Sequence, residues 1–112
     1  MRRTLSLAIL LTPVLSACTT SPPKLAEGLP GNVTARHDAQ WDQRLRERFP
    51  VGSEESLLLA ELRRQHFKVD PARGNASYPQ PNLPCRQDWW VNWKAEGGLI
   101  TEIAGEHNGA CL

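Results

Sequence analysis

The most constraining feature of this 112-residue sequence is an alternation of residue types near its C-terminus. A period of two is typical of a β-strand with one face against a core and the other toward solvent. Gly97-Gly98 follows the alternating segment, and a second apolar segment runs from Leu99 to Ala104. The sequence therefore predicts an antiparallel hairpin. The apolar side chains of its first strand are Trp89, Val91, Trp93 and Ala95.

The register of this hairpin depends on the length of its loop. A two-residue Gly97-Gly98 loop would pair Trp93 with Glu102 and place that carboxylate on the apolar face. A three-residue loop of residues 96–98 pairs Trp93 with Thr101 instead and puts Gly98 at a left-handed position. We therefore predict the three-residue loop. Its core face would consist of Trp89, Val91, Trp93, Leu99, Thr101 and Ile103, and its opposite face would carry Trp90 and Ile100.

A first helix is predicted upstream of the hairpin. Trp41, Leu45 and Phe49 recur at intervals of four residues, which places them on one face of a helix. The helix should begin near Asp38, a suitable N-cap, and end at Pro50. A tight turn at residues 49–52 is expected to follow.

A second helix is predicted after this turn, with Ser53 as its N-cap. Leu58 and Leu62 form its buried stripe. It should end near His66, because His tolerates a left-handed conformation better than a β-branched residue. A short strand is expected at residues 67–69. Residues 70–84 contain four prolines, so we predict a surface loop there.

The N-terminus has the pattern of a targeting segment. The basic Met1-Arg2-Arg3 precedes an apolar run from Leu5 to Leu15. These 11 residues are too few to cross a hydrocarbon core as a helix, which needs about 20, so the run is typical of a signal peptide. Leu15-Ser16-Ala17-Cys18 comes next and resembles a bacterial lipobox. Residues 1–17 are therefore predicted to be a lipoprotein signal peptide.

The lipobox resemblance implies that Cys18 becomes the first mature residue and carries a diacylglycerol and an N-acyl chain such as palmitate. Each buried methylene contributes about 0.8 kcal/mol, so these chains anchor the protein firmly in a membrane. Thr19 replaces the Asp that would retain a lipoprotein in the inner membrane, which implies the outer membrane with the protein facing the periplasm. Residues 18–32 are predicted to be a flexible linker that lifts a domain of residues 38–112 off the bilayer.

With Cys18 lipidated, Cys85 and Cys111 remain on either side of the hairpin. In an oxidising compartment this pair favours a disulfide, which would stabilise the domain by roughly 3–4 kcal/mol. The alternative is a metal site formed with His66 and His107. Neither the two Cys nor the two His have the short C-x₂₋₄-C or H-x₃₋₅-H spacing of zinc sites, so we expect the disulfide and no metal.

Charge and motifs disfavour nucleic-acid binding and catalysis. Thirteen Lys and Arg balance twelve Asp and Glu, so no basic surface is indicated. The sequence has no glycine-rich phosphate loop, nucleophile elbow or HExxH motif. We expect neither an enzyme nor a cofactor. The residues expected to be solvated, and not catalytic, are His37, His66, His107, Asp88, Glu96, Glu102 and Glu106.

Trp90 is not explained by the predicted core. It would share the outer face of the hairpin with Ile100. Exposed Trp is enriched at the hot spots of protein interfaces, so Trp90 and Ile100 are candidate binding residues for a partner protein. The alternative is that residues 70–84 cover this face.

These elements predict an α+β fold in which two N-terminal helices pack on a small antiparallel sheet. The order of helix, Phe49–Ser53 turn, helix and Cys-flanked Trp hairpin resembles small outer-membrane lipoproteins with a two-layer ααβββ domain, such as the BamE/SmpA-like group. The likeness covers roughly Asp38 to Leu112 and lies in architecture, and the Cys pair is not part of that group's pattern. The Phe49–Ser53 and Trp89–Trp93 motifs also resemble those of small uncharacterised proteobacterial lipoproteins.

The resemblance implies a non-catalytic, protein-binding accessory role in the assembly or maintenance of the envelope. The alternative is a protective lipoprotein that inhibits a periplasmic or cell-wall hydrolase. In that case residues 70–84 would be the inserting loop.

Overall fold

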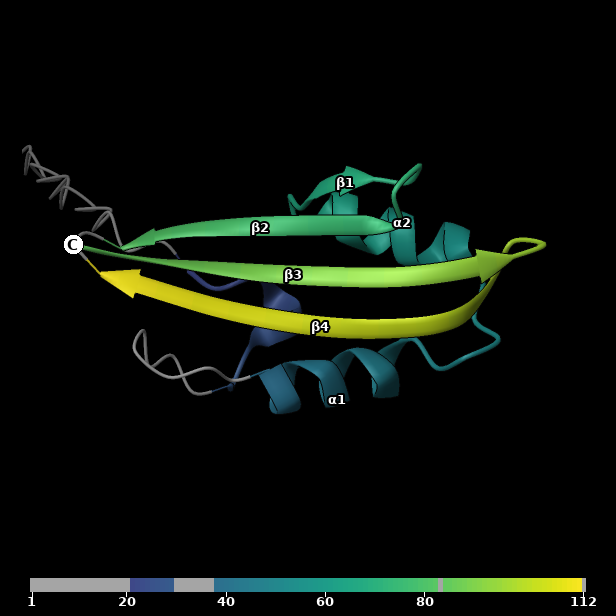
Figure 1. Ribbon diagram of the computed structural model, residues 1–112, viewed down its shortest axis with the longest axis horizontal. Helices are drawn as coiled ribbons and strands as arrows, with labels where there is room; N and C mark the ends of the chain where they lie inside the picture. Colours follow the sequence, from purple (N-terminus) through teal and green to yellow (C-terminus); the bar gives the residue numbers. More distant parts are fainter. Residues whose placement is uncertain (1–20, 30–37, 83, 112) are drawn as a thin grey trace, which may run out of the picture.

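The computed structural model describes residues 21–29, 38–82 and 84–111 (Figure 1). The predicted signal peptide and Cys18 lie outside these ranges. The strands form one antiparallel sheet in the order β1-β2-β3-β4, so the α+β fold with two helices ahead of an antiparallel sheet is confirmed. Among the described residues, no helix has the length and apolar character needed to cross a membrane. The elements are η1 (Lys24–Ala26), α1 (Asp38–Arg48), α2 (Glu55–Arg64), β1 (Lys68–Asp70), β2 (Asn75–Asn82), β3 (Cys85–Glu96) and β4 (Leu99–Cys111).

The helices pack against one face of the sheet. In Figure 1, α2 and η1 pass behind the strands, and α1 runs along β4. The alternation of side chains separates a covered face from an open face. Residues of the covered face that are buried are Ala76, Gln80, Gln87, Trp89, Val91, Trp93, Ile103, Gly105 and His107.

Helix α1 approaches β4 closely at Gly105. Trp41 and Leu45 are fully buried, as their spacing predicts. A Cβ at Gly105 would lie 2.6 Å from Trp41 Cδ1 and 2.7 Å from Leu45 Cδ1, so only glycine fits there. The backbone N–H of Gly105 donates to the carboxylate of Asp42 over 2.9 Å. This contact joins α1 to the outer edge of the sheet.

Helix α2 ends as its sequence predicts. His66 has φ +67°, and it is the only residue other than glycine with positive φ among the described residues. Its N–H donates to the Arg63 carbonyl, and the N–H of Phe67 donates to the Leu62 carbonyl, each over 3.0 Å. This pair of bonds is a Schellman motif.

The predicted N-cap of α2 is wrong. The helix begins at Glu55, and Glu54 occupies the cap position without a side-chain hydrogen bond. The Ser53 hydroxyl instead donates to the Pro50 carbonyl over 2.6 Å. Ser53 therefore closes the turn between the helices.

The predicted hairpin register is also wrong. Glu96 pairs with Leu99, so the loop has two residues, Gly97 and Gly98, with φ of +59° and +79°. These angles suit a type I′ turn, the tight connection that matches strand twist. Thr101 is then an extra residue in β4, because Ala95 pairs with Ile100 but Lys94 pairs with Glu102. This β-bulge turns Glu102 outward and places Ile103 opposite Trp93 on the covered face.

Residues 70–84 do not form the predicted loop, since most of them belong to β2. Proline usually disfavours a strand because it lacks an N–H. However, β1 pairs only with residues 75–77, so beyond Ser77 strand β2 has a partner on one side alone. Pro79 and Pro81 are two residues apart, so both can direct their nitrogens toward the side without a partner strand. The prolines thus suit an exposed strand edge.

The segment of residues 21–29, which we call the strap, packs on the covered face, although residues 18–32 were predicted to be a flexible linker. Leu25 and Ala26 are buried in the core. The N–H of Leu25 donates to Gln65 Oε1 over 2.8 Å, and Arg44 Nη1 donates to the carbonyls of Leu25 and Glu27 over 3.0 and 2.9 Å. Pro23 is buried as well, and Leu29 packs against the core, so the apolar residues of this stretch dock it on the sheet. The folded unit therefore extends beyond the predicted residues 38–112.

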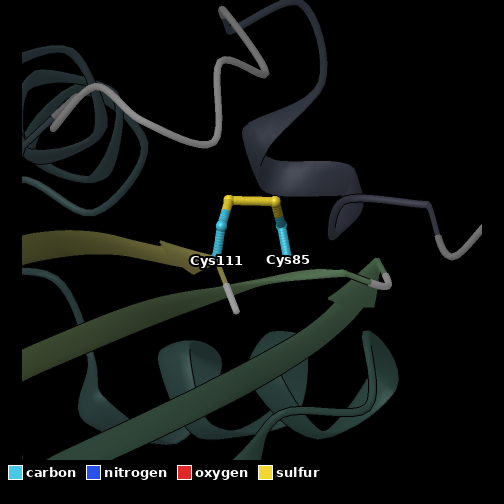
Figure 2. The surroundings of a disulfide bond; sticks show 2 residues. All are labelled: Cys85 and Cys111. Carbon is cyan, nitrogen blue, oxygen red and sulfur yellow. A yellow bond between two sulfur atoms is a disulfide. The ribbon is translucent and has the colours of Figure 1, made fainter.

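The predicted disulfide between Cys85 and Cys111 is confirmed (Figure 2). The two residues are direct cross-strand neighbours in β3 and β4, with their Cα atoms 3.9 Å apart. The bond therefore closes the end of the hairpin farthest from the Gly97-Gly98 turn.

Candidate functional site

The open face of the sheet is the candidate interaction site. Trp90 lies on β3 within this face, between its cross-strand neighbours Ser77 on β2 and Glu106 on β4. The side chain of Trp90 is half-buried. On β2, β3 and β4, the described residues that point to the open face alternate with those of the covered face, and none of them is buried. No described helix therefore covers this surface.

The described part of residues 70–84 does not cover Trp90 either. They were the alternative cover, but they form the end of β1, a turn and strand β2 beside β3. Ser77 and Pro79, the open-face residues of β2 nearest Trp90, are themselves only half-buried. The candidate cover is therefore a part of the same sheet.

Ile100 does not belong to this site, which corrects its assignment as a binding residue. Its side chain is 1% exposed and lies in the core. The bulge at Thr101 is the cause, because it changes which residues of β4 face the helices. Leu99, predicted to lie in the core, is 46% exposed. Thr101, also predicted to be a core residue, is exposed as well.

Charged pairs flank Trp90 along the strands. Arg86 Nη2 lies 3.1 Å from Asp88 Oδ1, and Lys94 Nζ lies 3.5 Å from Glu102 Oε2. Such exposed pairs contribute at most about 1 kcal/mol each to stability. They surround the aromatic side chain with a polar rim, which is a common composition for a protein interface.

The four tryptophans differ in how their indole N–H groups are used. Trp41 Nε1 donates to the Trp90 carbonyl over 2.8 Å, Trp89 Nε1 to Gln80 Oε1 over 3.0 Å, and Trp93 Nε1 to Glu55 Oε2 over 2.9 Å. Among the residues that the structure describes, none accepts a hydrogen bond from the indole N–H of Trp90. The indole N–H of Trp90 can therefore donate a hydrogen bond to a partner protein.

A depression of about 630 Å³ continues from the open face toward the turn between the helices. The cations at its rim are engaged by nearby carboxylates: Arg46 Nε lies 2.9 Å from Asp42 Oδ2, and Arg73 Nε lies 3.6 Å from Asp70 Oδ2. Its lining includes Arg46, Val51, Arg73, Asn92, Lys94 and Ala104. The depression thus combines apolar surface with paired charges.

The histidines are not equivalent. His66 is exposed as predicted, and His37 lies outside the described residues. His107 is fully buried, which corrects the expectation of a solvated side chain. Its Nε2 lies 2.9 Å from Gln87 Oε1, and its ring centroid lies 4.1 Å from that of Trp89. The position of His107 opposite Trp89 on the covered face accounts for its burial.

The acidic residues are distributed along the hairpin. Glu96 lies at the turn, Glu102 pairs with Lys94, and Glu106 lies opposite Trp90; all three are exposed. Asp88 is half-buried beside Arg86. Within the described parts of the chain, no group of three or more His, Cys, Asp or Glu side chains is placed to hold a metal ion.

Among the described residues, one carboxyl group has a shifted pKa. The hydrogen bond from Arg64 lowers the pKa of Glu61 below its usual value, and a hydrogen bond from Gln65 also lowers it, against the effect of burial. Gln65 Nε2 donates to Glu61 Oε1 over 2.6 Å, while its own Oε1 accepts the N–H of Leu25. Glu61 therefore orients the side chain that holds the strap.

Comparisons of the chain with protein-family models, curated proteins and solved structures give no match.

Proposed function

We propose that this chain is a lipid-anchored protein of the bacterial outer membrane that faces the periplasm. It acts there as a non-catalytic binding module for another envelope protein in envelope assembly or maintenance. The anchor is supported by the basic start, the short apolar run and the lipobox ending at Cys18. The binding surface is the open face around Trp90.

The observation that carries the binding role is the position of the half-buried Trp90 on a sheet face without a described cover. Tryptophan at the centre of a polar rim is the usual composition of an interface hot spot. The two edges of the sheet are less suited to pairing with a strand of a partner protein. Pro79 and Pro81 weaken pairing along β2, and the N–H of Gly52 already donates to the Ile100 carbonyl beside β4 over 2.8 Å.

The structure does not support the alternative role as a hydrolase inhibitor, because the loop that this role needs is not formed. It required residues 70–84 as a protruding loop, and most of these residues lie in β2. Only the four-residue turn of residues 71–74 remains between β1 and β2. A protein-binding face is therefore the better proposal.

Site-specific photocross-linking in intact cells tests the proposal. A photoreactive residue at Asn92, on the open face, should capture a specific envelope protein, and Trp90→Ala should abolish that capture. The control position is Leu57 on α2, which is 61% exposed and away from the open face. Equal capture from position 57, or capture from position 92 that is unchanged by Trp90→Ala, would disprove the binding face.

The anchor has a separate test. Cys18→Ser should move the protein from the membrane fraction to the soluble fraction and remove the mass of the lipid. A variant that stays in the membrane at the same level would disprove lipid anchoring through Cys18.

A further inference from the structure

The strap fixes the chain almost at the predicted site of lipid attachment. Tyr78 Oη donates to the carbonyl of Ser21 over 3.2 Å, so the first described residue of the strap already contacts the sheet. From there the strap crosses the covered face of the sheet to reach Gln65, the C-cap of α2, and Arg44 on α1. Leu25 and Ala26 are 7% and 1% exposed, so the crossing is held by burial as well as by hydrogen bonds.

The distance from Cys18 to the folded domain is therefore short. Three peptide units separate Cys18 from Ser21, and each spans at most 3.8 Å between Cα atoms, which gives a limit of about 11 Å. A flexible linker from Cys18 to Asp38 would instead have a root-mean-square length of about 25 Å and a much longer reach. The strap removes this freedom.

We infer that the domain is held against the lipid headgroups of its own membrane, with the strap end nearest to the bilayer. This inference rests on the proposed lipidation of Cys18. The lipid surface faces the exposed residues at the start of the strap, Ser21, Pro22 and Lys24. Lys24 adds a positive charge there, which favours anionic headgroups.

This placement also defines the partner. Tyr78 is the cross-strand neighbour of Trp89, and the hairpin turn begins eight residues further along β3, about 27 Å away. Trp90 is thus near the membrane-held part of the sheet. The partner of the open face is accordingly a protein that is itself bound to or embedded in the same membrane.

Energy transfer in vesicles tests the inference. The lipidated full chain is reconstituted in vesicles of phosphatidylethanolamine and phosphatidylglycerol that contain a dansyl-labelled headgroup, which accepts energy from tryptophan. The test variant carries 20 additional Gly and Ser residues between Thr20 and Ser21, which leaves the strap intact. The control variant carries the same insertion between Ala72 and Arg73, two exposed residues in the turn between β1 and β2, which leaves the hairpin turn intact.

The intact chain and the control should transfer energy efficiently, and the test variant should lose at least half of the transfer. Equal transfer in the intact chain and the test variant, with both floating with the vesicles, would overturn the inference while leaving lipid anchoring in place. A chain produced in its native host that does not float with vesicles would overturn the anchoring and the inference together.

Discussion

Gly105 on β4 lies directly against the indole ring of Trp41 on α1, and a Cβ added to it would lie 2.6 Å from Trp41 Cδ1. The N–H of Gly105 also donates to the carboxylate of Asp42, the residue that follows Trp41 in α1. Helix and sheet edge are therefore joined by one glycine. Its lack of a side chain is the condition for the packing of α1.

Gly105→Ala should destabilise the protein by about 1–3 kcal/mol, because the added methyl group overlaps the Trp41 and Leu45 side chains. Chemical denaturation monitored by circular dichroism measures the change. Asn108→Ala, at an exposed position of the same strand, is the control and should change stability little. Equal stabilities of Gly105→Ala and the unmodified protein would contradict the close packing of α1.

Replacement of both Cys85 and Cys111 by Ser should lower the free energy of unfolding by roughly 3–4 kcal/mol. The disulfide joins residues 26 positions apart, so its loss returns conformational freedom to the unfolded chain. Urea denaturation of the two proteins under oxidising conditions gives the difference. Coincident unfolding curves would show that the disulfide does not stabilise the fold.

Leu25→Ala should cost about 2–4 kcal/mol, because Leu25 belongs to the core. Lys24→Ala is the matched control, since its side chain is exposed and adjacent in the same 3₁₀ helix. Thermal unfolding of both variants distinguishes a docked strap from a free linker. If the two variants unfold at the same temperature, the strap is not part of the cooperative unit.

Glu61 should make stability depend on pH. Its pKa in the folded protein is lowered, chiefly by the hydrogen bond from Arg64. The stabilisation is therefore present above the usual carboxyl pKa of the unfolded chain and is lost as the pH falls through the lowered folded value. Glu61→Gln should unfold at a lower temperature than the unmodified protein near neutral pH, and this difference should shrink in acid.

Glu96→Gln serves as the control for the Glu61 variant, because Glu96 is exposed at the hairpin turn. Thermal unfolding of all three proteins across the acidic range provides the comparison. A difference between Glu61→Gln and the unmodified protein that stays constant down to strongly acidic pH would show that the Glu61 carboxylate is not responsible.

Local patterns predict the helices well because the helical signal lies in residues that are close in sequence. The spacing of Trp41, Leu45 and Phe49 specifies one buried face, and all three side chains are buried. The left-handed position of His66 also follows from a local signal, since the helical pattern ends there and polar residues tolerate that conformation. These features require only neighbouring residues.

The strands beyond the main hairpin depend on contacts that local patterns do not contain. From the sequence alone, Pro79 and Pro81 indicate a loop. Both can lie in β2 because β1 is short and leaves this edge of β2 without a partner strand. The bulge at Thr101 is similar. Glu102 does point away from the core, as expected. Either a three-residue loop or a bulge produces this direction, however. The type I′ turn at Gly97-Gly98 favours the two-residue loop and therefore the bulge.

The open face was only partly predictable. The alternation of Trp89 and Trp90 correctly separates a core residue from an outer one. Ile100 was misplaced because the register error moved it to the outer face. The strap had no clear signal, since Leu25 and Ala26 stand in a proline-containing stretch and their burial depends on Gln65 and Arg44, which are far away in sequence.

The central claim is that Trp90 on the open face binds a membrane-associated partner protein. The most direct test is the affinity of the cross-linked partner for the lipidated protein and for two variants, Trp90→Ala and Leu57→Ala, once all three show equal thermal stability. We predict that Trp90→Ala weakens binding by about 30-fold or more, the loss of about 2 kcal/mol expected at a hot spot, and that Leu57→Ala leaves it unchanged. Equal affinities of the Trp90→Ala variant and the unmodified protein would contradict the claim.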